Sequence, residues 1–292
     1  MRITNSMVAR AAVSGIQAQM RALDEARQQA TSGIRVSRPS DDPVAMAGVM
    51  QSSSGLRALD QYQRNLMSAQ SRLDVEDSTL TQLTDVLQRA KELAVSQATS
   101  TADGTTRSVT AAEVTQLVDF VKGLANTQLA GTYVYGGTYA DTPPYVGGAL
   151  DPAKPPQGAF KVEVGANRLL ETNHSAQEIF VDTDAVDGLQ ALADALNAND
   201  VTGIKNAMTR LDSAYDEVQN LTGDLGARMN QLDVTVSNLE SLEVNLQTFR
   251  SGLEDADLTE AVTRMVNRQN SLEAAMLANS KILDLTLSDY LR

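Results

Sequence analysis

Two sets of leucines recur every seven residues in distant parts of the chain, and this repeat restricts the possible folds more than any other feature. The first set is Leu59, Leu66, Leu73, Leu80 and Leu87, and the second is Leu225, Leu232, Leu239, Leu246 and Leu253. A seven-residue apolar repeat of this length places a seam on a long helix that must pack against another helix. We therefore expect a mainly α fold, an elongated multi-helix bundle or coiled coil made from both chain ends.

Large aromatic residues are too few to build a thick globular core. The 292 residues include no Trp, and aromatic residues make up 4% of the chain. Leu, Val, Met and Ala must then fill the interior, which suits thin helical bundles. A zipper transcription factor would need a basic helix ahead of the leucines, but the segment before Leu59 has only scattered arginines among acids and prolines. A cytoplasmic coiled-coil signalling or scaffold protein remains an alternative on these features.

The composition changes sharply in the middle of the chain. Five of the seven prolines and six of the eleven aromatic residues fall between Gly131 and Asp187. The pieces TYVYGG, AFKVEVG and EIFVD are typical of short strands bounded by Gly, Pro and Asn. We expect a small β-rich outer domain over residues 131–186. The helical pattern resumes at DGLQALADALNAND, where Asp187 is expected to cap a helix that begins at Gly188.

Apolar positions near both ends of the chain follow alternating steps of three and four residues. The N-terminal positions are Val13, Ile16, Met20, Leu23 and Ile34, and the C-terminal positions are Leu258, Val262, Met265, Leu272, Met276 and Leu283. Polar residues interrupt both stripes, so neither helix alone nor the pair has a good core, and isolated helices of this kind are marginal in water. We predict that these residues form an assembly interface, in which the two ends pack together and against further copies of the chain.

The stretch SRPSDDPVAMAG places two aspartates between two prolines, ahead of a long helical segment. Pro43 fits the first position of a helix, and Asp42 fits the N-cap that accepts backbone N–H bonds. Asp41 would add negative charge beside the positive end of the helix. Helix capping therefore explains both aspartates without a metal or a catalytic role.

No motif of an enzyme or a metal site stands out. The absence of Cys excludes disulfides, thiolate catalysis and zinc–thiolate sites. The sole histidine, His174, has no second His to share a metal, and we interpret it as a surface or turn residue. The run VDTDAVDG fails as a calcium loop because Val186 occupies a ligand position and Asp187 replaces the required Gly. We expect no catalytic residues, no cofactor and no metal.

Charge and hydropathy argue against nucleic acid and membranes as partners of this chain. A net charge of −13 argues against nucleic acid, which needs clustered Lys and Arg, and against anionic membrane surfaces. No apolar run approaches the ~18 residues of a membrane span. The segment MRITNSMVARAAVSGIQAQM lacks the continuous apolar core of a secretory signal peptide. The protein is expected to be either cytoplasmic or exported by a route without such a signal.

Four segments resemble the bacterial flagellin superfamily, and they occur in the order that the superfamily has. They are TSGIRVSRPSDDPVAMAG, LQRAKELAVSQAT, DLGARMNQLD and the closing stretch LEDADLTEAVTRMVNRQNSLEAAMLANSKILDLTLSDYL. The prolines of RPSDDPVAMA, the stretch GTYVYGGTYADTPPY and the closing LTLSDYLR look more like the hook–filament junction proteins (hook-associated protein 3) than like filament flagellins. Filament flagellin is the runner-up.

The resemblance implies a structural role in the flagellum. Residues 1–40 with 256–292 would form paired terminal helices of an inner layer, 41–130 with 187–255 a helical bundle core, and 131–186 the outer domain. A junction protein is expected to assemble into a ring between the first hook-associated protein on the hook side and flagellin on the filament side. It would be exported unfolded through the flagellar type III channel, after binding an export chaperone in the cytoplasm, and would then be extracellular.

Overall fold

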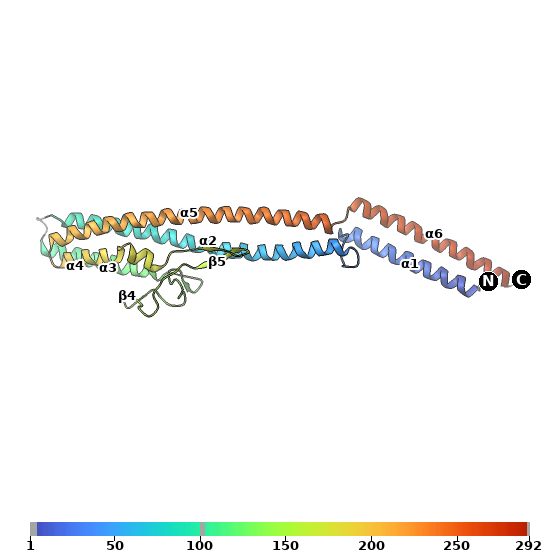
Figure 1. The fold of residues 1–292 in the computed structure, drawn as a ribbon, viewed down its shortest axis with the longest axis horizontal. Helices are drawn as coiled ribbons and strands as arrows, with labels where there is room; N and C mark the ends of the chain where they lie inside the picture. The colour runs from blue at the N-terminus through green and yellow to red at the C-terminus, as the bar shows by residue number, and fades with distance from the viewer. Residues whose placement is uncertain (1–4, 100–102, 291–292) are drawn as a thin grey trace. The chain divides into compact units, whose positions relative to one another are not determined.

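Long helices form both ends of the chain, and a small strand-containing region lies between them in the sequence (Figure 1). The computed structural model of the chain describes residues 5–99 and 103–290, without the side chains of residues 5, 6, 8, 9 and 282–290. The helices are α1 Asn5–Ser32, α2 Pro43–Gln97, α3 Gly104–Ala125, α4 Ala185–Asn197, α5 Val201–Glu254 and α6 Leu258–Tyr290. The prediction of a mainly α fold is confirmed.

By its internal contacts the chain divides into two units, one of residues 1–58 with 242–292 and one of residues 59–241. The boundaries of this division differ from those of the three-part division drawn from the sequence, which stays a prediction. Each unit is described separately below.

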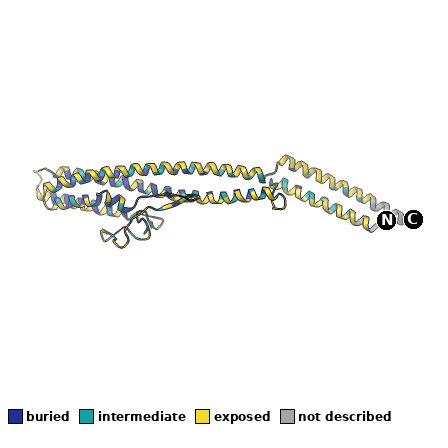
Figure 2. Ribbon diagram, in the orientation of Figure 1, coloured by how far each residue is buried: buried dark blue, intermediate teal, exposed yellow. Residues whose placement is uncertain are grey.

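The unit of residues 59–241 is a helical bundle built around the leucine repeats. Leu59, Leu66, Leu73, Leu80 and Leu87 of α2 and Leu225, Leu232 and Leu239 of α5 are all buried. Burying one such side chain is worth about 1.5–3 kcal/mol, so this seam is a main source of stability. Figure 2 shows the buried residues concentrated on the inner faces of these helices. Ion pairs lie at the rim, such as Lys91 with Asp212 at 2.6 Å between α2 and α5.

A buried arginine on α3 closes the end of the bundle where α2 stops. Arg107 is 4% exposed. Its Nε and Nη2 donate to the carbonyl of Gln97 at 3.2 Å, and Nη2 also donates to the carbonyl of Thr99 at 2.7 Å. Its Nη1 donates to the side chain of Asn199, in the turn between α4 and α5. Arg107 therefore satisfies carbonyls at the C-terminal end of α2, which has no further turn to bond them.

The middle of the chain holds three two-stranded antiparallel sheets. They pair β1 Gln128–Leu129 with β2 Thr132–Tyr133, β3 Tyr145–Val146 with β4 Ala149–Leu150, and β5 Lys161–Gly165 with β6 Arg168–Glu171. In the longest pair Val162 lies opposite Leu170, and both side chains are buried. Strands within TYVYGG and AFKVEVG are thus confirmed.

The strand predicted for EIFVD is wrong, because Gln177–Asp182 forms a π-helix, η1. Ile179 and Phe180 are consecutive and both fully buried, which a helical turn allows and a half-buried strand does not. Phe180 packs edge-to-face on Tyr135, with ring centroids 5.8 Å apart. Ser175 and Glu178 cap the start reciprocally: the Glu178 carboxylate accepts the Ser175 N–H at 2.7 Å, and the Glu178 N–H donates to Ser175 Oγ at 3.3 Å.

The predicted cap at Asp187 is also wrong, because α4 begins at Ala185 and places Asp187 in its first turn. The residue before the helix, Asp184, has φ of +61° and makes no side-chain cap bond. Its carboxylate binds Arg210 of α5 instead, at 2.6 Å from Nε and 2.5 Å from Nη2. An ion pair from the residue before α4 to α5 therefore replaces the local cap bond.

In the unit of residues 1–58 with 242–292, two glycines let α2 and α5 approach closely. A Cβ added at Gly48 would lie 2.6 Å from Leu253 Cδ1, and one at Gly55 would lie 3.0 Å from Leu246 Cδ1. The two glycines and the two leucines are each seven residues apart, so the last two leucines of the second repeat pack onto the two glycine positions of α2. The heptad seam therefore continues here with glycine opposite leucine.

Candidate assembly surface on the terminal helices

Helices α1 and α6 pack side by side and share a narrow apolar seam (Figure 1). Ala26 and Ala261 are buried. Five of the predicted interface residues are half-buried, namely Ile16, Leu23, Ile34, Met265 and Leu272. Each of these side chains is thus partly covered within the pair and keeps some surface for other contacts.

The other predicted residues with described side chains point largely to solvent. The exposed fractions are 54% for Val13, 52% for Met20, 57% for Leu258, 45% for Val262 and 54% for Met276. The side chain of Leu283 lies outside the described residues. Sequence reasoning missed three further exposed apolar residues on these helices, Met7 at 61%, Val266 at 45% and Leu277 at 66%. We call these eight residues the terminal apolar set: Met7, Val13, Met20, Leu258, Val262, Val266, Met276 and Leu277.

Helices α1 and α6 carry the terminal apolar set but bury few residues of their own. Figure 2 shows these two helices mostly exposed, with scattered half-buried residues and few buried ones. Exposed apolar side chains that recur along a helix pair are typical of a surface that packs against other helices. Two of the three missed residues, Val266 and Leu277, directly follow the predicted Met265 and Met276, whereas Met7 lies ahead of the predicted N-terminal positions.

Backbone hydrogen bonds join the two chain segments that lie at the base of this helix pair. The N–H groups of Arg35 and Val36 donate to the carbonyl of Glu254 at 2.7 and 3.2 Å, and the N–H of Ala256 donates to the carbonyl of Gly33 at 2.8 Å. The Arg35 side chain adds a bond from Nη2 to the carbonyl of Leu253 at 2.7 Å. These contacts fix where α1 ends relative to the point where α6 begins.

The acidic pair before α2 makes only local contacts. Asp42 Oδ1 accepts the N–H of Ala45 at 3.0 Å, α2 begins at Pro43, and Arg35 Nη1 lies 3.6 Å from Asp42 Oδ2. The hydrogen bond from Ala45 lowers the pKa of Asp42 below its ordinary value. Asp41 turns back into the preceding loop, where Oδ2 accepts the N–H groups of Ser37 and Arg38 at 3.1 and 2.9 Å.

Replacing Asp42 with Ala is expected to lower the midpoint of thermal unfolding by about 2–4 °C, the usual effect of losing one N-cap in a chain of this size. Replacing it with Asn should leave the midpoint nearly unchanged, because an amide oxygen caps as well as a carboxylate. Far-UV circular dichroism measures both. A similar loss in both variants would mean that the charge, and not the cap bond, is what stabilises the helix start.

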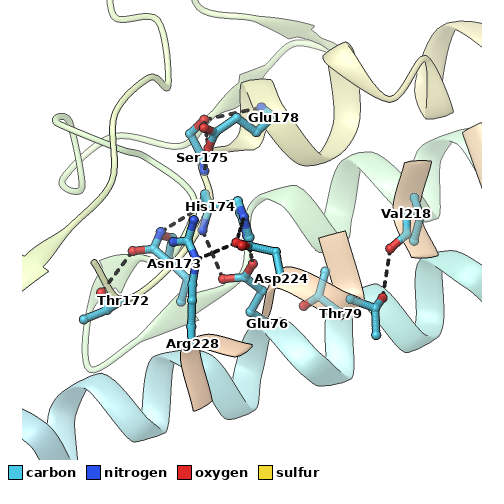
Figure 3. A network of polar contacts seen from close by, with 12 residues as sticks. Glu76, Thr79, Thr172, Asn173, His174, Ser175, Glu178, Val218, Asp224 and Arg228 are labelled. Carbon is cyan, nitrogen blue, oxygen red and sulfur yellow. Dashed lines mark hydrogen bonds and ion pairs between the residues drawn. The ribbon is translucent and has the colours of Figure 1, made fainter. Parts of the chain in front are cut away.

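A buried polar cluster in the unit of residues 59–241 overturns the interpretation of His174 as a surface residue. His174 is 5% exposed, and the three neighbouring residues Thr172, Asn173 and Ser175 are also buried. Figure 3 shows the His174 ring between Glu76 of α2 and Asp224 of α5, with Arg228 beside Asp224. We call Glu76, His174, Asp224 and Arg228 the His174 cluster. The one sequence signal nearby was the capping pair Ser175 and Glu178, which predicts a helix start directly after His174.

Among residues 5–99 and 103–290, no group of three or more His, Cys, Asp and Glu side chains is arranged to hold a metal ion. Within the same residues, no helix combines the length and the apolar character that a membrane crossing needs. The helix pair α1 and α6 is the candidate functional surface because it exposes the terminal apolar set.

Two family models account for most of the chain outside its middle. The bacterial flagellin N-terminal helical region matches residues 3–139, and the bacterial flagellin C-terminal helical region matches residues 208–291. The chain belongs to the bacterial flagellin family. Members of the flagellin family are structural proteins of the flagellum, so this chain is a flagellar structural protein.

Relatives of this flagellin-family chain carry two kinds of name. Flagellin of Halalkalibacterium halodurans is 27% identical over 261 residues, which cover 88% of this chain and 87% of that protein. Flagellar hook-associated protein 3 of Escherichia coli is 27% identical over 294 residues, covering 89% of this chain and 90% of that protein. The solved structure of flagellar hook-associated protein 3 from Legionella pneumophila matches with a TM-score of 0.62 at 14% identity. It covers 70% of this chain and 98% of that one, and at this identity it shows the fold alone.

Proposed function

We propose that this chain is the adaptor of the hook–filament junction, which links the first hook-associated protein to the flagellin filament. The observation that carries the proposal is the terminal apolar set, exposed on a helix pair that has little core of its own. A flagellar structural protein with such a surface completes its packing by association with further subunits.

Association would follow from ordinary helix packing. Half-buried residues such as Leu23 and Leu272 hold α1 to α6, and the exposed residues then meet the same surface of neighbouring copies. Each apolar side chain covered in this way gains stability in proportion to the area removed from water. A ring of copies would present one edge to the hook side and the other to flagellin. Residues 1–40 with 256–292 would form the inner layer of that ring, and residues 131–186 the outer domain.

The choice of junction protein over filament subunit rests on the middle segment and on the prolines that precede the second helix. The stretch from Gly131 to Tyr145 and the prolines around Asp42 look like junction proteins, and a relative of that name aligns over 89% of the chain. Filament flagellin remains the second candidate, because a flagellin aligns over 88% of the chain at the same identity. Export through the flagellar channel and capture of α6 by a chaperone belong to the same proposal.

Immunogold labelling of intact flagella, with antibody against residues 131–186, tests the assignment. Label at a single point next to the hook is the expected result, and label along the whole filament would make the chain a filament subunit. Deletion of the gene supplies a second test. Loss of an adaptor should leave flagellin in the culture medium without attached filaments, whereas loss of the filament subunit should remove that flagellin as well.

A further inference from the structure

We propose that His174 is a buried imidazolium whose second proton holds α5 to the segment 172–176, and that loss of this proton in alkaline solution releases the contact. Segment 172–176 is the return path from β6 to η1 and α4. The proposal concerns a conformational device within the unit of residues 59–241 and does not depend on which flagellar role the chain has.

The protonation state follows from what faces the ring. His174 Nδ1 contacts Glu76 Oε1, and Nε2 lies 3.1 Å from Asp224 Oδ2 (Figure 3). An ionised carboxylate only accepts hydrogen bonds, and a neutral imidazole has a single N–H to donate. With both carboxylates ionised, both contacts are hydrogen bonds only if both ring nitrogens carry protons. The geometry therefore assigns a positive charge to His174.

The two carboxylates hold the ring in different ways. Glu76 is fully buried, and its Oε2 also accepts the backbone N–H of His174 at 3.1 Å, so it is bound to the segment by main chain and side chain together. The Asp224 side chain is 52% exposed, and its Oδ2 is shared with Arg228 Nε at 2.7 Å. Because Asp224 has solvent and an arginine as alternative partners, the contact from His174 to Asp224 is the one that opens.

Acidic groups from four neighbouring elements favour the second proton, and Arg228 opposes it. Glu76 faces the ring from α2, Asp224 and Arg228 from α5, Glu178 from η1 and Glu171 from β6, so four acids surround the ring with one arginine. Burial by itself lowers the pKa of His174, but the hydrogen bond and the charge of Glu76 outweigh it and raise the pKa above the ordinary value of 6.5.

The direction of the pH effect follows from this raised pKa. A histidine with a higher pKa in the folded protein than in the unfolded chain stabilises the fold fully below the unfolded value of about 6.5. That stabilisation is lost as the pH rises through the folded value. On deprotonation the Nε2 lone pair would face a carboxylate oxygen of Asp224, so the contact turns from attraction to repulsion. Solution below the folded pKa of His174 should thus keep α5 bound to segment 172–176, and solution above it should release α5.

Nitrogen NMR of the full chain with ¹⁵N-labelled histidine tests the charge state directly, because the chain has a single histidine. Below the titration midpoint of the folded protein both ring nitrogens should show imidazolium shifts, and this midpoint should lie above that of the same protein unfolded in urea. A midpoint at or below the unfolded one would overturn the proposal.

Replacing Asp224 with Asn separates a proton-dependent contact from a merely structural histidine. An amide can donate to Nε2, so the ring no longer needs its second proton. The titration midpoint of His174 should fall in this variant, and the decrease in melting temperature from about pH 6.5 to about pH 9 should become smaller than in the wild type. Asp216→Asn, an exposed carboxylate two turns earlier on the same helix, is the matched control and should behave like the wild type. Equal pH dependence in Asp224→Asn and the wild type would refute the release of Asp224 as its origin.

Discussion

Glu76→Ala is expected to lower the free energy of unfolding by about 3–5 kcal/mol, because it breaks a buried ion pair. Glu76 is fully buried, and its two carboxylate oxygens take the ring and the backbone N–H of His174. Removing it leaves a buried ring nitrogen and a buried amide without partners, and it also opens a small cavity between α2 and segment 172–176. Urea unfolding followed by far-UV circular dichroism measures the loss.

The neighbouring residue supplies the control for this prediction. Asp77→Ala removes an exposed carboxylate at the next position of α2, and its effect should stay within about 0.5 kcal/mol. A loss under about 1 kcal/mol in Glu76→Ala would mean that the contacts of the His174 cluster are replaced by solvent at little cost.

Met20→Asp combined with Met276→Asp is expected to abolish assembly into the flagellum while hardly changing the melting temperature of the purified chain. Both methionines are more than half exposed, so the free subunit loses little packing. In an assembled layer the same two positions would bury carboxylates against apolar neighbours, which is strongly unfavourable. Complementation of a strain that lacks the gene, scored by motility and by flagella per cell, gives the readout.

Two measurements keep this result interpretable. Immunoblotting of the culture medium checks that the variant is still exported. Val234→Asp changes an equally exposed apolar residue of α5, at 61% exposure, and should leave motility intact. Normal flagella in the double variant would remove the terminal apolar set from the assembly interface, and a sharp fall of its melting temperature would place the two methionines in the core of the subunit instead.

The helices could be predicted from the sequence because their signals are periodic and long. Five leucines at seven-residue spacing leave α2 only one face to bury, and Asp42 with Pro43 marks its start within one residue. The terminal stripes gave the pairing of α1 with α6 for the same reason. The sequence does not show which residues of the stripes stay exposed. Met265 is half-buried and Met276 is exposed, and this difference depends on the position of the partner helix.

The middle of the chain depended on contacts between residues far apart, and there the local patterns misled. EIFVD has strand-forming residues, but Tyr135 and the cap of Ser175 with Glu178 favour a helical turn. Asp184 makes no local cap bond, because its carboxylate binds Arg210, 26 residues away. His174 is in a polar segment, yet it is buried and bound by the carboxylate of Glu76, which lies 98 residues earlier in the chain. Apart from the capping pair of Ser175 and Glu178, none of these partners can be identified from spacing along the sequence.

The backbone bonds that join Gly33 and Val36 to Glu254 and Ala256 limit how the length of this protein can change in evolution. Main-chain atoms fix the end of α1 against the start of α6, so gaining or losing one residue inside either helix would turn all positions beyond it by about 100° around the helix axis. The apolar residues would then leave the shared seam. Insertions are instead expected in the loops of residues 131–186, whose short paired strands do not depend on a helical register.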